Sequence, residues 1–438
     1  MKVYLHSIGC RLNQSEIETM ARQLLAAGHE IVDDTAVADT AIINTCAVTA
    51  AAARDGRNLT RRLHHANPTA EVVLTGCYAT IAPQELARVQ GAGRIVPNAQ
   101  KARLVQLLDP QARLDLPVFD QEPVLRELRS GVGGAGVGVA NTRAFVKVQD
   151  GCNNRCTFCI TTIARGPGQS RPLGDVVVEV QALAAAGYRE AVLTGVHLGS
   201  YGRDLDANVG LRDLVQALLT HTAIPRLRLS SLEPWDLEPD FFTLWTNPRL
   251  LPHLHLPLQS GSDAILRRMA RRTSRAAFRA LVEAARAAIP DLNLSTDLIL
   301  GFPGETEADF QDSLEYVRDI GFGRLHAFPY SQRPGTAAAQ MPDQIPGPVR
   351  KARTRRMIAL GEELSLAYHR RYVGDVRPVL WEQNVGADKD GLLWSGYTDN
   401  YIRVTAHGPA DLFNRVTAVH LTSAQADGMR GAIVAAEA

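Results

Sequence analysis

Strand-like and helix-like segments alternate along most of this chain, in two series separated by a glycine-rich run. The first series predicts helices near 15–27, 50–65, 83–89 and 101–108, and strands at 3–8, 41–44, 72–75 and 94–96. Strict alternation of this kind favours a parallel sheet covered by helices. Two of the strand segments, AIINT and VVLTG, are almost wholly apolar, which suits burial on both faces. We therefore predict an α/β fold with an open parallel sheet at the N-terminus.

The second series begins at Ala144 and has six strand–helix units. Its helices are expected at 175–186, 211–220, 275–288 and 307–319, and its strands at 145–149, 191–194, 226–230, 253–258, 294–300 and 324–329. Six such units in series predict a partial (βα)6 barrel. A basic amphipathic helix is expected over 350–370. Short β-like runs then follow at 376–381, 391–396, 402–406 and 416–421, and they predict a small C-terminal β-barrel.

These patterns divide the chain into an α/β domain at 1–128, a linker at 129–142, a barrel with its basic helix at 143–370, and a β domain at 371–438. The linker is predicted from the run SGVGGAGVGVAN at 130–141. Net charge is +1, which argues neither for nor against a nucleic-acid partner. The N-terminus lacks the apolar core of a signal peptide, and no run of 18 apolar residues occurs. We expect a cytoplasmic protein that has no membrane partner.

Three of the six cysteines lie close together directly after the first barrel strand, in VQDGCNNRCTFCITT. Cys152, Cys156 and Cys159 have the spacing C-x3-C-x2-C, and thiolates this close can hold one corner of an iron–sulfur cubane. Barrel active sites lie at the carboxyl ends of the strands, where this loop is expected. Three ligands leave one metal position open for a substrate. The alternative is a zinc site, but no histidine or further cysteine follows within 30 residues of Cys159.

The other three cysteines each follow a predicted strand of the N-terminal sheet. Cys10, Cys46 and Cys77 are separated by 36 and 31 residues, which is the length of one or two short strand–helix units. They are therefore expected at the ligand-binding edge of a parallel sheet. A second three-cysteine iron–sulfur site explains this placement. Three unrelated core thiols, or a zinc site completed by His6 or another side chain, remain as alternatives.

The C-x3-C-x2-C motif, with Phe158 before its last cysteine, resembles the signature of the radical S-adenosylmethionine superfamily. Over nearly its whole length, the chain looks like the methylthiotransferase family of that superfamily. This resemblance implies an auxiliary 4Fe-4S cluster on Cys10, Cys46 and Cys77, a radical 4Fe-4S cluster on Cys152, Cys156 and Cys159, and a C-terminal TRAM domain. It also implies that one S-adenosylmethionine molecule donates a methyl group to sulfur and a second is cleaved to a radical that activates an adenine C2–H bond.

Five stretches resemble the branch of the family that acts on N6-threonylcarbamoyladenosine at position 37 of tRNA: IGCRLNQSE (8–16), VLTGVHLGSYGRD (192–204), LQSGSDAILRRMARRTS (258–274), TDLILGFPGETEADF (296–310) and LHAFPYSQRPGTAA (325–338). The isopentenyladenosine and ribosomal-protein branches carry other residues after the first cysteine, and they remain as alternatives. This chain departs from the family at ITTIARG after Cys159, where a Pro-Tyr pair is usual. Residues 372–438 carry five Arg or Lys and eight Asp or Glu, an acidic balance for a domain expected to bind RNA.

Further site residues follow from the resemblance, each with a structural alternative. The predicted S-adenosylmethionine contacts are Phe158, Thr194, Gly195, Glu233, Gln259 and Gly301. Gly301, Pro303 and Gly304 could equally serve only to shape a turn. Arg165 and Arg171 could clamp a carboxylate or a phosphate. The predicted RNA contacts, in two basic runs that could instead be solvated surface, are Arg267, Arg268, Arg271, Arg272, Arg353 and Arg355. The partners expected are tRNA and a reductant such as flavodoxin or ferredoxin.

Overall fold

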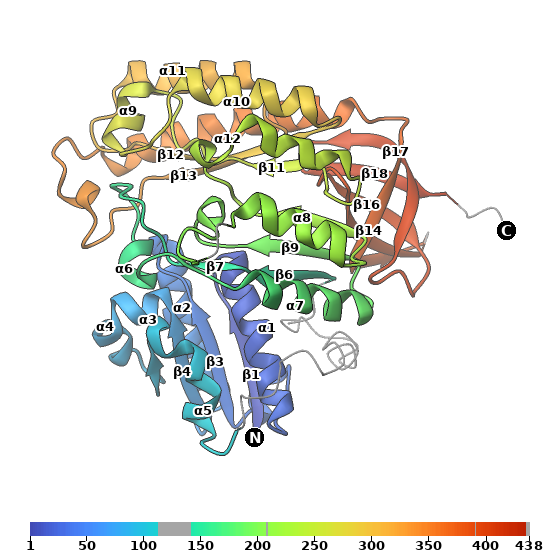
Figure 1. Ribbon diagram of the computed structural model, residues 1–438. Helices are drawn as coiled ribbons and strands as arrows, with labels where there is room; N and C mark the ends of the chain where they lie inside the picture. The colour runs from blue at the N-terminus through green and yellow to red at the C-terminus, as the bar shows by residue number, and fades with distance from the viewer. Residues whose placement is uncertain (113–141, 207–208, 390, 435–438) are drawn as a thin grey trace. The chain divides into compact units, whose positions relative to one another are not determined.

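The computed structural model describes residues 1–112, 142–206, 209–389 and 391–434 (Figure 1). The predicted glycine-rich linker lies almost wholly outside these residues. Contacts divide the chain into a first unit (1–154, 159–187 and 194–196) and a second unit (155–158, 188–193 and 197–438). No helix in the described part of the chain is both long enough and apolar enough to span a bilayer.

The first unit contains a five-stranded sheet in the order β2-β1-β3-β4-β5. Every neighbouring pair is parallel, which confirms the open parallel sheet. The strands are β1 (Lys2–Ser7), β2 (Glu30–Ile31), β3 (Thr40–Thr45), β4 (Glu71–Gly76) and β5 (Ile95–Val96). All six residues of β3 are buried, as its apolar sequence predicts for a central strand.

Helices cover both faces of this sheet: α1 (Arg11–Ala26), α2 (Ala50–Ala66), α3 (Cys77–Ile81), α4 (Pro83–Ala87) and α5 (Leu104–Leu108), with 3-10 turns η1 (Thr35–Val37) and η2 (Asn98–Arg103). Ile42 packs in one apolar cluster with Leu24 of α1. Its neighbour Ile43 packs in another with Leu59 of α2. Successive residues of a strand point to opposite faces, so each helix closes its own half of the core.

The first unit continues into the segment that carries two of the clustered cysteines. Its elements are β6 (Arg143–Lys147), β7 (Gln149–Asp150), α6 (Thr161–Arg165), β8 (Gln169–Ser170) and α7 (Leu173–Ala185). β7 and β8 pair antiparallel, an arrangement that the alternating pattern did not predict. This pairing brings the residues on either side of the cysteine loop together at its base.

The second unit has parallel pairs β9–β10 and β11–β12–β13, in line with the predicted barrel strands. Its strands are β9 (Glu190–Thr194), β10 (Arg226–Leu229), β11 (His253–His255), β12 (Asn293–Leu300) and β13 (Arg324–Pro329). Its helices and 3-10 turns are η4 (Leu198–Ser200), α8 (Leu211–His221), η5 (Pro234–Asp236), η6 (Pro239–Thr246), α9 (Asp263–Arg268), α10 (Arg275–Ala288), α11 (Glu307–Ile320) and η7 (Ala337–Gln340).

The C-terminal part of the second unit is a closed barrel in the order β14-β15-β16-β18-β17. The long helix α12 (Gly347–Arg370) precedes it, and its strands are β14 (Val376–Asp388), β15 (Gly391–Thr398), β16 (Arg403–Gly408), β17 (Val416–Gln425) and β18 (Gly428–Ile433). Trp381, Trp394 and Val419 fill its core. The predicted small β-barrel is confirmed. The closing strand β18 was missed, because the segment GMRGAI carries two glycines, which weaken a strand pattern.

Candidate active site

The strand-end cysteines of the first unit lie at one edge of its sheet. Cys46 follows β3 directly, Cys77 begins α3 at the end of β4, and Cys10 caps α1 just beyond β1. β1, β3 and β4 are neighbours in the sheet and run parallel, so their carboxyl ends meet at the same edge. Cys46 and Cys77 are buried, whereas Cys10 is exposed. This edge is where ligands bind in open α/β sheets.

The loop after β1 approaches Cys46 very closely. Gly9 has a φ of +109°, and a Cβ at this position would lie 2.5 Å from Cys46 Cβ and 2.8 Å from its Sγ. Burial raises the pKa of Cys46 to about 11; a backbone hydrogen bond from Val48 opposes the rise, and the Cys10 and Cys77 thiolates add to it. The three sulfur atoms are thus electrostatically coupled. Burial and the neighbouring thiolate charges both oppose ionisation of Cys46, and a cationic group at the sulfur atoms would offset both.

Three thiols at one sheet edge are a donor set that fits an iron–sulfur cluster. Polar groups surround the sulfurs: the Val48 N–H donates to Cys46 Sγ at 3.5 Å, and Asn98 Nδ2 donates to Cys77 Sγ at 3.7 Å. Hydrogen bonds to sulfur are a principal means by which proteins tune such clusters.

A buried ionic network stands behind this edge, centred on Glu16 of α1. Its Oε1 accepts from Arg165 at 2.9 Å, and its Oε2 accepts from Lys101 at 2.7 Å. Arg165 also binds Asp150, and Lys147 lies 3.4 Å from Glu16. Burial opposes the charge on Arg165, but Glu16, the Cys77 thiolate and Asp150 outweigh it and hold its pKa well above the ordinary value. Three cations face two carboxylates, and the excess positive charge favours thiolates nearby.

The short helix α6 connects the two cysteine sets within the first unit. It begins two residues after Cys159, and Ile160 and Ala164 belong to the same apolar cluster as Cys77. Asn98 donates to the Ala164 carbonyl at 2.7 Å as well as to Cys77 Sγ. At the end of α6, Arg165 donates to Asn13 Oδ1 at 2.7 Å, three residues beyond Cys10. The segment that follows Cys159 is therefore part of the wall of the strand-edge cysteine site.

Backbone groups of the C-x3-C-x2-C loop point at its own sulfur atoms. The Asn154 N–H donates to Cys152 Sγ at 3.4 Å, and the Thr161 N–H donates to Cys159 Sγ at 3.4 Å. The Cys152 N–H itself donates to the Gly166 carbonyl at 3.0 Å, which ties the start of the loop to its end. N–H groups aimed at sulfur favour thiolates, so this loop also fits an iron–sulfur cluster.

In the second unit, Arg271 lies against the middle cysteine of this loop. It approaches Cys156 Sγ at 3.8 Å, binds both carboxylate oxygens of Glu233 at 3.1 and 2.6 Å, and stacks on Trp235 with 4.4 Å to the ring centroid. Its side chain is 1% exposed. The prediction that Arg271 contacts RNA is therefore corrected, because the guanidinium is enclosed and already paired. Glu233, a predicted S-adenosylmethionine contact, is the residue that holds it.

The other predicted S-adenosylmethionine contacts have defined local roles. Thr194 is buried and donates to the Val146 carbonyl at 3.2 Å, and Gly195 follows it at the end of β9. Phe158 packs with Met269 and Phe302 in the second unit.

Two of these positions have backbone in the left-handed region. Gln259 adopts a φ of +72°, which is strained for a residue other than glycine. Gly301, with a φ of +70°, could not carry a Cβ without meeting the stem of Arg350, which gives it a structural role.

The remaining arginines fall into exposed and enclosed sets. Arg267, Arg272 and Arg355 are exposed, whereas Arg268 is half-buried and donates to the Pro303 carbonyl at 3.0 Å. Arg353 is buried, binds Glu305 at 2.8 Å and Glu307 at 3.2 Å, and is no more available to RNA than Arg271; this prediction is corrected too. The carboxylates that Arg165 and Arg171 clamp belong to the chain itself, with Glu179 as the partner of Arg171.

Two family models match the chain. The one described as "Uncharacterized protein family UPF0004" matches residues 2–96, which include Cys10, Cys46 and Cys77. The model of the radical SAM superfamily matches residues 146–317, which include Cys152, Cys156 and Cys159. Each match thus covers one of the two cysteine sets.

Relatives resemble the chain over almost its full length. The threonylcarbamoyladenosine tRNA methylthiotransferase MtaB of Bacillus subtilis is 34% identical over 96% of this chain and 94% of its own length. MtaB of Thermotoga maritima is 35% identical over 92% of this chain and 90% of its own length. The tRNA-2-methylthio-N(6)-dimethylallyladenosine synthase of Acidothermus cellulolyticus is 36% identical over 93% of this chain and 84% of its own length.

Solved structures share the fold. The radical S-adenosylmethionine methyltransferase TsrM of Kitasatospora setae, solved with cobalamin and a [4Fe-4S] cluster bound, superposes with a TM-score of 0.55 at 16% identity and covers 77% of this chain and 76% of its own. At that identity the likeness concerns fold alone. The full-length relatives, the two matched models and the paired cysteine sets together establish that the chain belongs to the radical S-adenosylmethionine methylthiotransferase family.

Proposed function

We propose that this enzyme methylthiolates C2 of N6-threonylcarbamoyladenosine at position 37 of tRNA. The observation that carries the proposal is the packing of α6, the helix that follows Cys159, whose Ile160 and Ala164 lie in the apolar cluster of Cys77. A C2–H bond has no acidic proton, so acid–base catalysis cannot activate it, and a radical source next to a sulfur source answers this need.

Two 4Fe-4S clusters and S-adenosylmethionine are the cofactors in this proposal. When bound, they supply reductive cleavage of S-adenosylmethionine at one cluster and the transferred sulfur at the other. Cys152, Cys156 and Cys159 hold the first cluster, and Cys10, Cys46 and Cys77 hold the second. Because Gly9 has no Cβ, Cys46 can lie against the loop after β1. The Arg165–Glu16 pair keeps α6 against the strand edge. Phe158, Thr194, Gly195, Gln259 and Gly301 remain our candidates for contact with S-adenosylmethionine.

The choice of substrate rests on the relatives' names and on the family stretches. The Bacillus and Thermotoga relatives are named for threonylcarbamoyladenosine, and the Acidothermus relative for dimethylallyladenosine at a similar identity. Another tRNA adenosine is therefore the second candidate, followed by a ribosomal protein. Exposed Arg267, Arg272 and Arg355 are proposed to contact tRNA phosphates, and a flavodoxin or ferredoxin to supply electrons in the cytoplasm. We place the domain boundaries at 128, 142 and 370.

Nucleoside mass spectrometry of bulk tRNA tests this proposal. A bacterial strain that lacks its own threonylcarbamoyladenosine methylthiotransferase is complemented with this chain or with its Cys77→Ala variant. We expect 2-methylthio-N6-threonylcarbamoyladenosine to reappear with the intact chain and not with the variant. Restoration of 2-methylthio-N6-dimethylallyladenosine instead, in a strain lacking that enzyme, would move the assignment to the second candidate. Failure in both strains, with protein present and both clusters loaded, would reject a tRNA substrate of either kind.

A further inference from the structure

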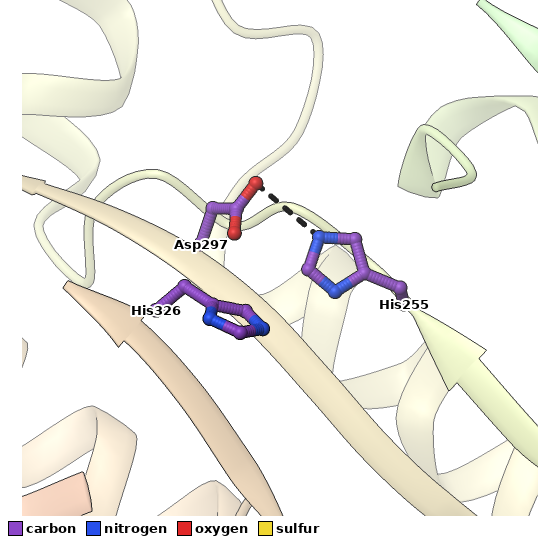
Figure 2. A group of neighbouring side chains, drawn as sticks. All are labelled: His255, Asp297 and His326. Carbon is purple, nitrogen blue, oxygen red and sulfur yellow. Dashed lines mark ion pairs between the residues drawn. The ribbon is translucent and has the colours of Figure 1, made fainter. Parts of the chain in front are cut away.

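Two histidines and an aspartate converge on the central strands of the second unit, away from both cysteine sets in the sequence. His255 ends β11, Asp297 lies in β12 and His326 lies in β13. One ligand atom from each lies within 4.8 Å of the other two, and no other such group of three is found in the parts of the chain that the structure describes. Figure 2 shows the three side chains gathered over adjacent strands, with Asp297 joined to His255.

Strand register explains why these residues meet. Asp297 is the cross-strand partner of His326, and His255 is the partner of Ser295, two residues before Asp297. Positions two apart on a strand share a face, so all three side chains project from one side of the sheet. Ile299, on the same face of β12, packs in a cluster with Phe158 of the cysteine loop. The group therefore shares a face of the sheet with Ile299, which packs against the same apolar cluster as Phe158.

The hydrogen bonds around His255 prepare its ring for a cation. His255 Nδ1 lies 2.9 Å from Ser295 Oγ, which in turn lies 3.4 Å from the Leu254 carbonyl. The other ring nitrogen, Nε2, faces Asp297 Oδ2 at 3.2 Å. Without a metal, an Nε2–H donates to this carboxylate, and a metal ion would take the place of that proton between the two atoms. A second-sphere hydroxyl that fixes the other ring nitrogen is a common feature of histidine metal ligands.

Exposure and charge also suit an accessible site. The side chains of His255 and Asp297 are 12% and 31% exposed, so the group is open enough for an ion to enter. An ionised carboxylate beside two imidazoles is a ligand set that zinc and other first-row divalent metals accept.

We propose that His255, Asp297 and His326 form a binding site for one divalent transition-metal ion. Three protein ligands leave positions open on the ion, as catalytic rather than structural metal sites do. Those positions would accept water or an oxygen of a bound substrate. None of the three ligands belongs to either cysteine triad, so the ion is proposed in addition to the two iron–sulfur clusters.

Measurement of the zinc content of the reconstituted enzyme tests the site. Enzyme carrying both clusters is mixed anaerobically with Zn²⁺, passed through a desalting column and analysed for zinc and iron by mass spectrometry. The ligand variants are Asp297→Asn, which keeps size and hydrogen bonding but removes the charge, and His326→Gln. The control is His407→Gln, which breaks a similar pair, His407–Asp388 at 2.9 Å, in the C-terminal barrel. Iron content identifies any sample in which zinc has replaced a cluster.

The enzyme and the His407→Gln variant are expected to retain one more zinc ion per chain than Asp297→Asn and His326→Gln. Zn²⁺ should also raise the melting temperature of the first two proteins only, because an ion that binds the folded state alone stabilises it. Circular dichroism identifies a variant that does not fold, and the His255→Gln variant then takes its place. Equal zinc and equal melting temperatures in all folded variants would overturn the proposal and leave a hydrogen-bonded His–Asp pair. Neither outcome bears on the tRNA assignment.

Discussion

Removal of the Glu16 charge should lower the free energy of unfolding of the first unit. Glu16 is 4% exposed and faces Lys101 and Arg165, whose side chains are 7% and 3% exposed. At an effective dielectric constant of about 20, unit charges about 2.8 Å apart attract by roughly 6 kcal/mol. The desolvation of each ion, at several kcal/mol, consumes most of this attraction. Loss of one member of such a buried set typically costs about 3–5 kcal/mol, because the remaining charges stay buried without compensation.

The effect of Glu16→Gln is best measured by hydrogen exchange. All four tryptophans lie at or beyond Trp235, so their fluorescence does not report on the first unit. Amide exchange in peptides from β3 and β4 does report on it, since these central strands open only with the core. A loss of about 3–5 kcal/mol, at about 1.4 kcal/mol per factor of ten, predicts exchange roughly 100- to 5,000-fold faster.

The matched control is Glu85→Gln, which removes an exposed carboxylate paired with Arg57 at 2.9 Å. Glu85 is 55% exposed, and surface pairs contribute at most about 1 kcal/mol, so exchange should change by less than about fivefold. If Glu16→Gln and Glu85→Gln exchange at the same rate in β3 and β4, the buried network does not stabilise this unit and the reasoning fails.

Three further predictions follow from individual contacts. The Gly9→Ala variant should bind about four irons fewer per chain on reconstitution, because its Cβ would collide with Cys46. The control Gly28→Ala, with a φ of +80° and open space around it, should keep all of its iron, and iron analysis distinguishes the two variants. Burial opposes ionisation of Glu16, but Lys101, Arg165 and Lys147 hold its pKa well below the ordinary value of about 4.3, so its stabilisation is complete above about pH 5 and declines as the pH falls toward the depressed value. The exchange-rate ratio of Glu16→Gln to wild type should therefore stay constant from pH 7 to about pH 5 and shrink below that. Substitution of Arg267, Arg272 and Arg355 together by Gln should weaken tRNA binding and lower its salt dependence in filter-binding assays. The control Arg279→Gln, whose guanidinium is already paired with Asp319 of α11, should change neither.

The cysteine placement and the sheet could be predicted from the sequence because both depend on local patterns. Apolar runs such as AIINT mark central parallel strands, and a residue that follows such a strand must lie at its carboxyl end. β18 could not be predicted in this way, because GMRGAI lacks an apolar alternation and forms a strand only through its partners β16 and β17. Its conformation comes from tertiary pairing rather than from propensity.

The partners of buried charged residues could not be predicted from the sequence. The run RRMARRTSR has the appearance of a basic surface, yet Arg271 within it is enclosed by Glu233 and Trp235, which lie more than thirty residues earlier. The Glu16–Arg165 pair spans 149 residues, and the His255–Asp297–His326 group draws on three separate strands. No local pattern encodes such partners. They become visible only when the sheet register brings the strands together.

Iron and product analysis of two triple variants tests the central claim, that each cysteine triad holds its own cluster and serves its own step. The intact enzyme should bind about eight irons, and both the Cys10/Cys46/Cys77→Ala and the Cys152/Cys156/Cys159→Ala variants about four. The first variant should still cleave S-adenosylmethionine to 5′-deoxyadenosine without forming methylthiolated adenosine, and the second should do neither. About four irons in the intact enzyme, or full methylthiolation by the first variant, would contradict the account.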